Sequence, residues 1–264
     1  MRLLKRLVAV GCLFAGPAWA GEAPRSVVEL FTSQGCSSCP PADRLASELA
    51  PDDRMLVLTL AVDYWDYLGW KDTLASPANS ARQRAYAMAR GDRKVFTPQI
   101  VVNGRESAVG GDRKAVEAAI ARAEGSGGLA LPVALKIEDG RLEVEVAAPR
   151  GPLKERHGEV WAFAIQKSRP VEIGKGENAG RHVVYANVVR HMTRLGAWEG
   201  APAKFEIAAD EVMSPDSDSL AVLVQAGNGG QPGGVLGAAR ADAEAPPAPA
   251  VVPTTTSRLS REPY

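Results

Sequence analysis

The sequence contains few cysteines, few histidines and no formal net charge, and each shortage excludes a class of protein. Its 264 residues include three cysteines and three histidines. A small scaffold held together by disulfides would carry more cysteines, and a chain of this length can bury a core without them. The formal net charge at pH 7 is +0. This balance argues against binding to nucleic acid or to an anionic membrane surface.

Long apolar runs are absent from the sequence after its N-terminus. The first residues are basic, residues 7–16 are apolar but too short to span a bilayer, and residues 18–20 read Ala-Trp-Ala. This order predicts a secretory signal peptide over residues 1–20, with the mature chain starting at Gly21 and Cys12 removed. A buried N-terminal helix is the alternative. We expect a secreted protein, periplasmic in a Gram-negative source, without stable membrane insertion after signal removal.

Residues 21–127 alternate strand-like and helix-like segments, which predicts an α/β arrangement. The expected strands are 26–33, 54–63 and 96–103, and the expected helices are 40–50, 79–90 and one that Asp112 caps. On the second of these helices we interpret three arginines, Arg82, Arg84 and Arg90, as a solvated face.

Residues 128–240 carry almost no helix signal and predict an all-β domain. Alternating apolar residues on either side of Asp139-Gly140 indicate a hairpin, and several more short strands favour a β-sandwich. Two glycine-rich stretches, 174–180 and 227–234, lack the Lys-Ser/Thr of a phosphate loop, and we interpret both as loops of this domain. The tail over 241–264, rich in alanine and proline, is predicted to be disordered.

The chemistry of the chain centres on Cys36 and Cys39, which follow a predicted strand and precede a predicted helix. The partial positive charge and unpaired N–H groups of a helix N-terminus stabilise a thiolate and lower the pKa of Cys36. Cys39 is placed to attack a mixed disulfide formed at Cys36. The spacing therefore fits a nucleophile and a resolving thiol. Gln34 and Asp43 flank the motif and are interpreted as ordinary polar residues of a helix start.

Other uses of the cysteine pair stay open. A permanent disulfide needs no further residue, and two thiolates can hold Cu(I). His191-Met192 is the soft pair that could add copper ligands, although packing within a strand is the ordinary role of such residues. A structural zinc needs four ligands, and the chain has no second cysteine pair. We therefore expect no metal site and no cofactor.

Thr97-Pro98 opens a later predicted strand, a position that tolerates the missing N–H of proline. A strand, a CxxC at a helix start, a strand, a helix, and then Thr-Pro before another strand and a closing helix resemble the thioredoxin fold. The resemblance implies a cis Pro98 beside the cysteines, with Cys36 attacking, Cys39 resolving, and Thr97-Pro98 binding substrate backbone. The chain departs from standard thioredoxins in its Ser-Ser dipeptide and in the position of Pro98, 59 positions after Cys39.

The mature chain as a whole resembles a family of bacterial secreted thioredoxin-like proteins known mainly as a domain of unknown function. Four stretches carry the resemblance: VELFTSQGCSSCPPAD, VDYWDYLGWKD, TPQIVVNG and GENAGRHVVYANVVRHMTRLGAW. It implies a thioredoxin-like domain over 21–127 and a β-sandwich-like domain over 128–240. It does not imply a substrate.

The insertion concentrates aromatic residues in the segment 61–72, AVDYWDYLGWKD. We predict that Trp65 and Trp70 line a groove above Cys36 that binds an extended peptide or an apolar ligand. Asp63 follows a predicted strand, where α/β sites gather, and is a candidate for moving protons. The alternatives are a satellite hydrophobic cluster under a long loop and a structural role for Asp63.

Together these features predict a secreted thiol–disulfide oxidoreductase with a Cys36-Ser-Ser-Cys39 redox centre and a protein thiol or disulfide as its partner. The rival hypothesis is a non-catalytic thioredoxin-like binding or assembly protein with a structural disulfide or a copper-delivery site. A third hypothesis is a carrier of apolar ligands that uses the aromatic segment.

Overall fold

The computed structural model of the chain describes residues 23–243. The predicted signal peptide, residues 1–20, lies outside the described residues, and so does the predicted disordered tail from residue 244 onward. The beginning of that tail was placed wrongly: Ala241 and Asp242 belong to the last strand, which pairs with its neighbour as far as Ser219.

The first part of the chain forms alternating strands and helices, and the predicted strands and helices are present. In chain order they are β1 (Ser26–Thr32), α1 (Pro40–Leu49), β2 (Met55–Ala61), the short 3-10 helix η1 (Asp66–Leu68), α2 (Pro77–Arg90), β3 (Gln99–Val102), β4 (Glu106–Val109) and α3 (Arg113–Gly125). Strand β1 pairs parallel with β2 and antiparallel with β3. Strand β4, which forms a hairpin with β3, is an addition to the predicted elements.

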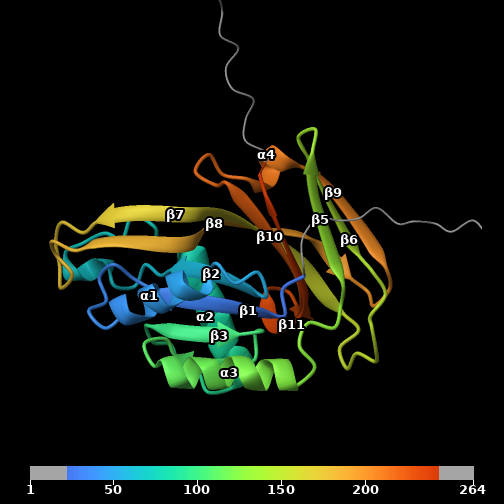
Figure 1. Ribbon diagram of the computed structural model, residues 1–264, viewed down its shortest axis with the longest axis horizontal. Coiled ribbons are helices and arrows are strands. Elements are labelled where there is room, and N and C mark those ends of the chain that lie inside the picture. The colour runs from blue at the N-terminus through green and yellow to red at the C-terminus, as the bar shows by residue number, and fades with distance from the viewer. Residues whose placement is uncertain (1–22, 244–264) are drawn as a thin grey trace, which may run out of the picture.

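The second part of the chain is almost entirely β. Its elements are β5 (Val133–Glu138), β6 (Arg141–Val146), β7 (Gly158–Glu172), β8 (His182–Trp198), β9 (Ala203–Ala208), the short helix α4 (Ala209–Val212), β10 (Ser219–Asn228) and β11 (Gln231–Asp242). The predicted hairpin around Asp139-Gly140 joins β5 to β6. Strands β5, β6 and β9 form a separate three-stranded sheet, seen at the right in Figure 1.

One eight-stranded sheet runs through both parts of the chain, in the order β11-β10-β7-β8-β2-β1-β3-β4 (Figure 1). The junction is between β8 and β2, which are joined at the residue pair Thr59 and Val188 and by a hydrogen bond from the Thr59 hydroxyl to the Ala186 carbonyl, 2.6 Å. The sheet therefore crosses the predicted boundary between residues 127 and 128. Strands β7 and β8 bring a loop of the second part beside the start of α1.

The core divides according to the faces of the sheet. Val28 and Leu30 of β1 point toward α1 and α3, whereas Val27 and Phe31 point toward α2 and the strands β7 and β10. A further cluster fills the space between the three-stranded sheet and the outer part of the large sheet. Strand β1 is buried along its whole length, which explains its almost continuous apolar sequence.

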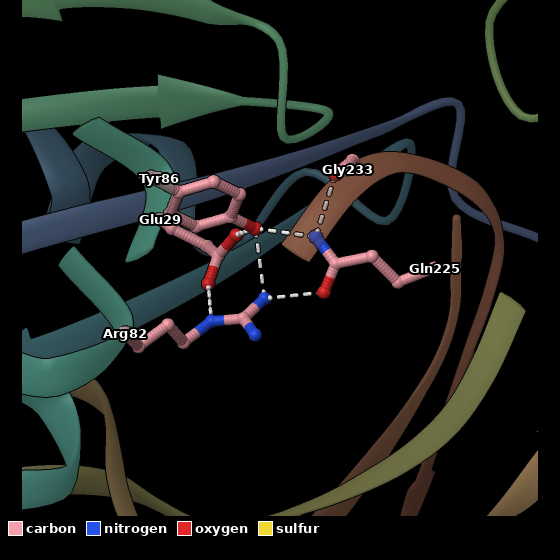
Figure 2. Close-up of polar contacts among 5 residues, drawn as sticks. All are labelled: Glu29, Arg82, Tyr86, Gln225 and Gly233. Carbon is pink, nitrogen blue, oxygen red and sulfur yellow. Dashed lines mark hydrogen bonds and ion pairs between the residues drawn. The ribbon is translucent and has the colours of Figure 1, made fainter. Parts of the chain in front are cut away.

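Glu29 interrupts that apolar sequence, and its carboxylate is fully buried. It accepts hydrogen bonds from Arg82 Nε, 2.6 Å, and from the Tyr86 hydroxyl, 2.5 Å. Arg82 also donates to Gln225 Oε1, 3.0 Å, and Gln225 Nε2 donates to the Gly233 carbonyl, 2.8 Å (Figure 2). The network ties together β1, α2, β10 and β11.

The prediction that Arg82 lies on a solvated face is therefore wrong, although Arg84 two residues later is exposed. The side chains of Arg82 and Glu29 pair inside the protein, where each would be costly alone. Burial raises the pKa of the Tyr86 hydroxyl, so this hydroxyl stays protonated and donates to the Glu29 carboxylate.

Replacing Arg82 by leucine is expected to lower the free energy of unfolding by about 3–5 kcal/mol, because the buried Glu29 carboxylate loses its cation. Urea unfolding of the variant and the wild-type protein measures the difference. Arg84→Leu, on the exposed side of the same helix, is the matched control and should change stability by less than about 0.5 kcal/mol. Equal effects of the two substitutions would show that the ion pair has no special importance.

Candidate active site around the Cys36–Cys39 disulfide

Cys36 and Cys39 form a disulfide in the turn between β1 and α1, with their Cα atoms 5.4 Å apart. Cys39 is the residue before the first helical residue, and its carbonyl accepts hydrogen bonds from the N–H groups of Ala42 and Asp43. The Cys36 Sγ atom lies 3.5 Å from the Ser38 hydroxyl. The predicted position of the pair at a helix start is confirmed.

Both cysteines are buried: the exposed fraction is 1% for Cys36 and 0% for Cys39. The two serines between them are exposed. A partner sulfur approaching from solvent therefore meets Ser37 and Ser38 first, and it reaches Cys36 only after neighbouring groups move.

Asn178 closes one side of the cysteine turn. It lies in the loop between β7 and β8, and its amide nitrogen donates to the carbonyls of Gln34 and Cys36, at 2.9 Å each. Its side chain is 2% exposed. The stretch 174–180 is thus a loop, as predicted, but it also covers the motif. No local sequence signal could reveal this contact, because it spans 142 residues of the chain.

Trp65 connects the cysteine turn to the Thr97-Pro98 loop. Its indole N–H donates to the Thr97 hydroxyl, 2.8 Å. A Cβ atom at Gly35 would lie 3.2 Å from the Cβ of Trp65, so this side chain packs against the backbone just before Cys36. The structure therefore brings together Trp65 and Thr97, two predicted site residues, beside the disulfide.

The Thr97-Pro98 peptide bond is cis, as the thioredoxin resemblance implies. The Pro98 carbonyl accepts a hydrogen bond from the Gly110 N–H, 2.9 Å. A Cβ atom at Gly110 would lie 3.3 Å from the Cβ of Pro98 and 3.0 Å from the Cβ of Ala42. The cis proline and the first turn of α1 therefore approach the same point.

Trp70 supports the turn from another side. Its indole N–H donates to the side-chain carbonyl of Gln34, 2.8 Å, and a Cβ atom at Gly174 would lie 3.1 Å from its ring. Gln34 is buried, and its backbone N–H donates to the Asp72 carboxylate, 2.7 Å. Gln34 is therefore not an ordinary polar residue of a helix start: it links the aromatic insertion to the cysteine turn.

Asp63 has its hydrogen-bond partner on α2. The Ser80 hydroxyl donates to its carboxylate, 2.5 Å, and the Asp63 backbone N–H donates back to the same hydroxyl, 3.2 Å. These contacts agree with the structural alternative for Asp63 and do not link it to the cysteines.

Asp43 is the buried carboxyl group on the helix of the cysteine pair. It follows Cys39 by four residues, which places both on one face of α1, and it accepts a hydrogen bond from the Thr32 hydroxyl, 2.6 Å. The pKa of Asp43 is raised to about 7, chiefly by burial and to a smaller extent by the negative charge of Asp72, although the hydrogen bond from Thr32 lowers it. Asp43 lies in the first turn of α1, as the interpretation as a helix-start residue expects, but its side chain is buried, which that interpretation did not include.

Asp43 belongs to a small buried group of acidic and phenolic side chains. Burial also raises the pKa of Asp72, although the N–H groups of Gln34 and Leu74 hydrogen-bond to its carboxylate. Tyr185 of β8 has a raised pKa because it is buried and because it senses the charges of Asp43 and Asp72. Three side chains with raised pKa values, Asp43, Asp72 and Tyr185, therefore lie close to the disulfide turn.

The His191-Met192 pair, considered above as possible copper ligands, lies on β8. His191 is opposite Ala164 of β7, and Met192 is opposite Phe163 and packs against the core. Within residues 23–243, no group of three or more His, Cys, Asp or Glu side chains is arranged to hold a metal ion. In the same range no helix combines the length and the apolar character needed to cross a bilayer.

The fold and site define a protein with a mixed sheet and a cysteine pair at the start of a helix beside a cis proline. A family model described as protein of unknown function (DUF1223) matches residues 27–225, and the chain belongs to this family. No curated protein matches the chain.

Two solved structures are similar to the chain. The crystal structure of a protein from Agrobacterium tumefaciens has 33% identity and a TM-score of 0.72, over 84% of this chain and 95% of that one. HBP35 of Porphyromonas gingivalis has 17% identity and a TM-score of 0.59, over 92% of this chain and 82% of that one. The second likeness concerns the fold alone.

Asp43→Asn is expected to stabilise the protein more at high pH than at low pH. The folded pKa of Asp43, about 7, lies above the ordinary value of 3.8. Between these values the folded protein keeps a proton that the unfolded chain has released, so this group lowers stability as pH rises toward 7. The stability difference between variant and wild type should grow by about 2–3 kcal/mol between about pH 5 and about pH 8.

Urea unfolding at both pH values measures this difference. Asp139→Asn, in an exposed turn, is the control at the same two pH values; an equal growth of its difference would show that the effect is not specific to the buried carboxyl group. A pH-independent difference for Asp43→Asn would show that Asp43 is already ionised in the folded protein at about pH 5.

Asn178→Ala is expected to speed the reduction of the disulfide by dithiothreitol about tenfold. The substitution removes both hydrogen bonds that hold the covering loop, whose net stabilisation is about 1–2 kcal/mol. Alkylation of the released thiols followed by mass spectrometry gives the rate. Glu177→Ala, at the exposed neighbouring position, should leave the rate unchanged; if the two variants react alike, the loop does not control access.

Proposed function

We propose that this protein is a secreted thiol–disulfide oxidoreductase of thioredoxin-like fold, and that Cys36 and Cys39 are its redox pair. The observation that carries the proposal is a disulfide at the start of α1 with a cis Thr97-Pro98 bond approaching the same helix turn. The strand order β2-β1-β3-β4, with β1 and β2 parallel, is the arrangement expected of that fold and supports it.

The exchange proceeds in two steps. A partner thiolate attacks Cys36 Sγ, a partner–Cys36 disulfide forms, and the Cys36–Cys39 bond breaks with Cys39 leaving as a thiolate. A second partner thiolate then attacks the partner's own sulfur, which releases Cys36 as a thiolate and leaves the partner oxidised. Two electrons pass to the cysteine pair, and the protons of the two partner thiols go to solvent or to the released thiolates.

Asp43 is suited to supply the proton that Cys39 takes up on leaving. Its carboxyl group is on the same helix face as Cys39, and its pKa of about 7 keeps a substantial fraction protonated near neutral pH. Thr97 and Pro98 would align the partner backbone, with Trp65 fixing the Thr97 hydroxyl. In this scheme Trp70 holds the turn through Gln34 and does not contact the partner.

A specific observation favours the rival, a non-catalytic protein with a permanent disulfide: both sulfurs belong to buried residues. Catalysis requires a nucleophile that a partner can reach. Under the proposal, the loop that carries Asn178 opens during exchange. Under the rival, it stays closed and the pair only holds β1 to α1.

The reduction potential of residues 21–264 in glutathione buffers separates the two functions. We expect a midpoint between about −120 and −270 mV, the range of thiol–disulfide enzymes. Thiol alkylation and mass spectrometry count the reduced and oxidised forms. A pair that remains oxidised below about −300 mV would overturn the proposal and leave a structural disulfide.

Trapping variants provide the control. Cys39→Ser should accumulate a mixed disulfide at Cys36 with an oxidised model dithiol peptide, because the resolving thiol is absent. Cys36→Ser should accumulate much less, because the proposal assigns the attack on the partner to Cys36 and only the resolving step to Cys39. Stoichiometric binding of Cu(I) by the reduced protein, with loss of binding in Cys36→Ser, would point to copper delivery.

A further inference from the structure

A groove of about 680 Å³ begins at Pro40, directly after the cysteine motif. One wall is α1, from Pro40 to Glu48, and the other is the start of β8 with the facing end of β7. The Ser47 hydroxyl reaches across it to the Val184 carbonyl, 3.3 Å. The groove therefore leads away from the disulfide along the first helix.

The charged side chains that line the groove are mostly basic: Arg44, Lys167, Arg181 and His182 against the single carboxylate of Glu48. Glu48 is neutralised by Arg113, which lies within salt-bridge distance. Lys167 pairs with Asp242, 3.0 Å, and His182 lies 3.9 Å from Glu172.

Arg44 and Arg181 are different from these paired groups. Both are exposed on opposite walls of the groove. In the part of the chain that the structure describes, neither forms a salt bridge. The positive charge of Arg44 lowers the pKa of the neighbouring Asp43, but the two side chains are not within salt-bridge distance. A ligand that enters the groove therefore meets two unpaired guanidinium groups.

The strand wall of the groove offers a second kind of contact. One edge of β8 pairs with β7 from His182 to Ala186. The other edge pairs with β2 only further along, at Val188. Among the described residues, the start of β8 has no strand partner on the α1 side. Val184, which lines the groove there, is 57% exposed. Two carbonyls on that side are already hydrogen-bonded, Val184 to the Ser47 hydroxyl and Ala186 to the Thr59 hydroxyl. An extended peptide that adds a strand here would displace the Ser47 contact, pair with the remaining groups of the edge and cover Val184.

We propose that this groove binds an extended acidic segment of the partner protein. Carboxylates at alternate positions of the segment would pair with Arg44 and Arg181, while its backbone follows the start of β8 and an apolar side chain covers Val184. Binding here places the partner next to Pro40, one residue from Cys39. This role as a partner-docking surface rests on the proposed function, but the binding itself does not depend on the redox state.

The test uses a fluorescein-labelled ten-residue peptide of alternating glutamate and valine, and its counterpart with lysine in place of glutamate. Fluorescence anisotropy with residues 21–264 measures both affinities at low and physiological ionic strength. We expect the acidic peptide to bind at least about tenfold more tightly than the basic one, with an advantage that salt reduces. Arg44→Glu/Arg181→Glu should weaken the acidic peptide at least about tenfold.

The control variant is Arg150→Glu/Arg169→Glu, which makes the same change of net charge at exposed positions outside the groove and should not change the affinity. Arg44→Gln/Arg181→Gln, the milder pair, should weaken binding in the same direction and serves if the reversal unfolds the protein. Equal binding of the two peptides, or equal loss in the control, would overturn the proposal. Displacement of the peptide by an equimolar amount of inorganic phosphate would instead indicate a small-anion site and also overturn it.

Cys36→Ser/Cys39→Ser separates this proposal from the oxidoreductase function. The variant cannot exchange disulfides but should bind the acidic peptide as the wild type does. Retained binding together with a pair that resists reduction would leave the groove as a docking site of a non-catalytic protein. If the acidic peptide does not bind but the reduction potential lies in the range of thiol–disulfide enzymes, the docking proposal is rejected and the oxidoreductase proposal is retained.

Discussion

The fold depends on one buried ion pair, between Glu29 at the centre of β1 and Arg82 of α2 (Figure 2). A carboxylate in the middle of a doubly covered strand would be costly without a cation, and a guanidinium would be costly without a carboxylate. Tyr86 hydrogen-bonds to both charged groups and Gln225 to Arg82, so the pair also has hydrogen bonds from neutral side chains. Because Gln225 belongs to β10, the same interaction fixes the second part of the chain against the first.

The orientation that this pair imposes on α2 also positions the loops of the candidate site. The polar residues next to Arg82 face the same way: Asn79 donates to the Ala61 carbonyl, 2.9 Å, and Gln83 donates to the Phe96 carbonyl, 2.8 Å. The first contact holds the end of β2, where the aromatic insertion begins, and the second holds the residue before the Thr97-Pro98 bond. Helix α2 therefore links the buried Glu29–Arg82 ion pair to the two segments that border the cysteines.

The turn that carries the Cys36–Cys39 disulfide is enclosed. Asn178, Gln34 and Trp65 hold it from three directions, and the accessible atoms nearest to it belong to the serine dipeptide. Such enclosure protects a disulfide from adventitious thiols, and it also makes exchange conditional on loop movement. The basic groove along α1 lies beside the loop that carries Asn178, since Arg181 follows Asn178 by three residues. One hairpin, β7–β8, therefore carries both a wall of the groove and the cover over the disulfide.

Local sequence patterns determined most of the elements. The apolar run of β1, the prolines that open α1, the Asp112 cap and the Asp139-Gly140 hairpin each arise from interactions between near neighbours, so they could be predicted, as could the cysteine pair at the helix start. Only the tertiary structure decided that one sheet crosses both parts, that Arg82 is buried, and that Asn178 covers Cys36. These outcomes depend on contacts between residues 53 to 144 positions apart. Distant residues become partners when the chain packs, because an unpaired polar group is costly once it is buried. Short-range periodicity in the sequence does not indicate which distant residues will pair.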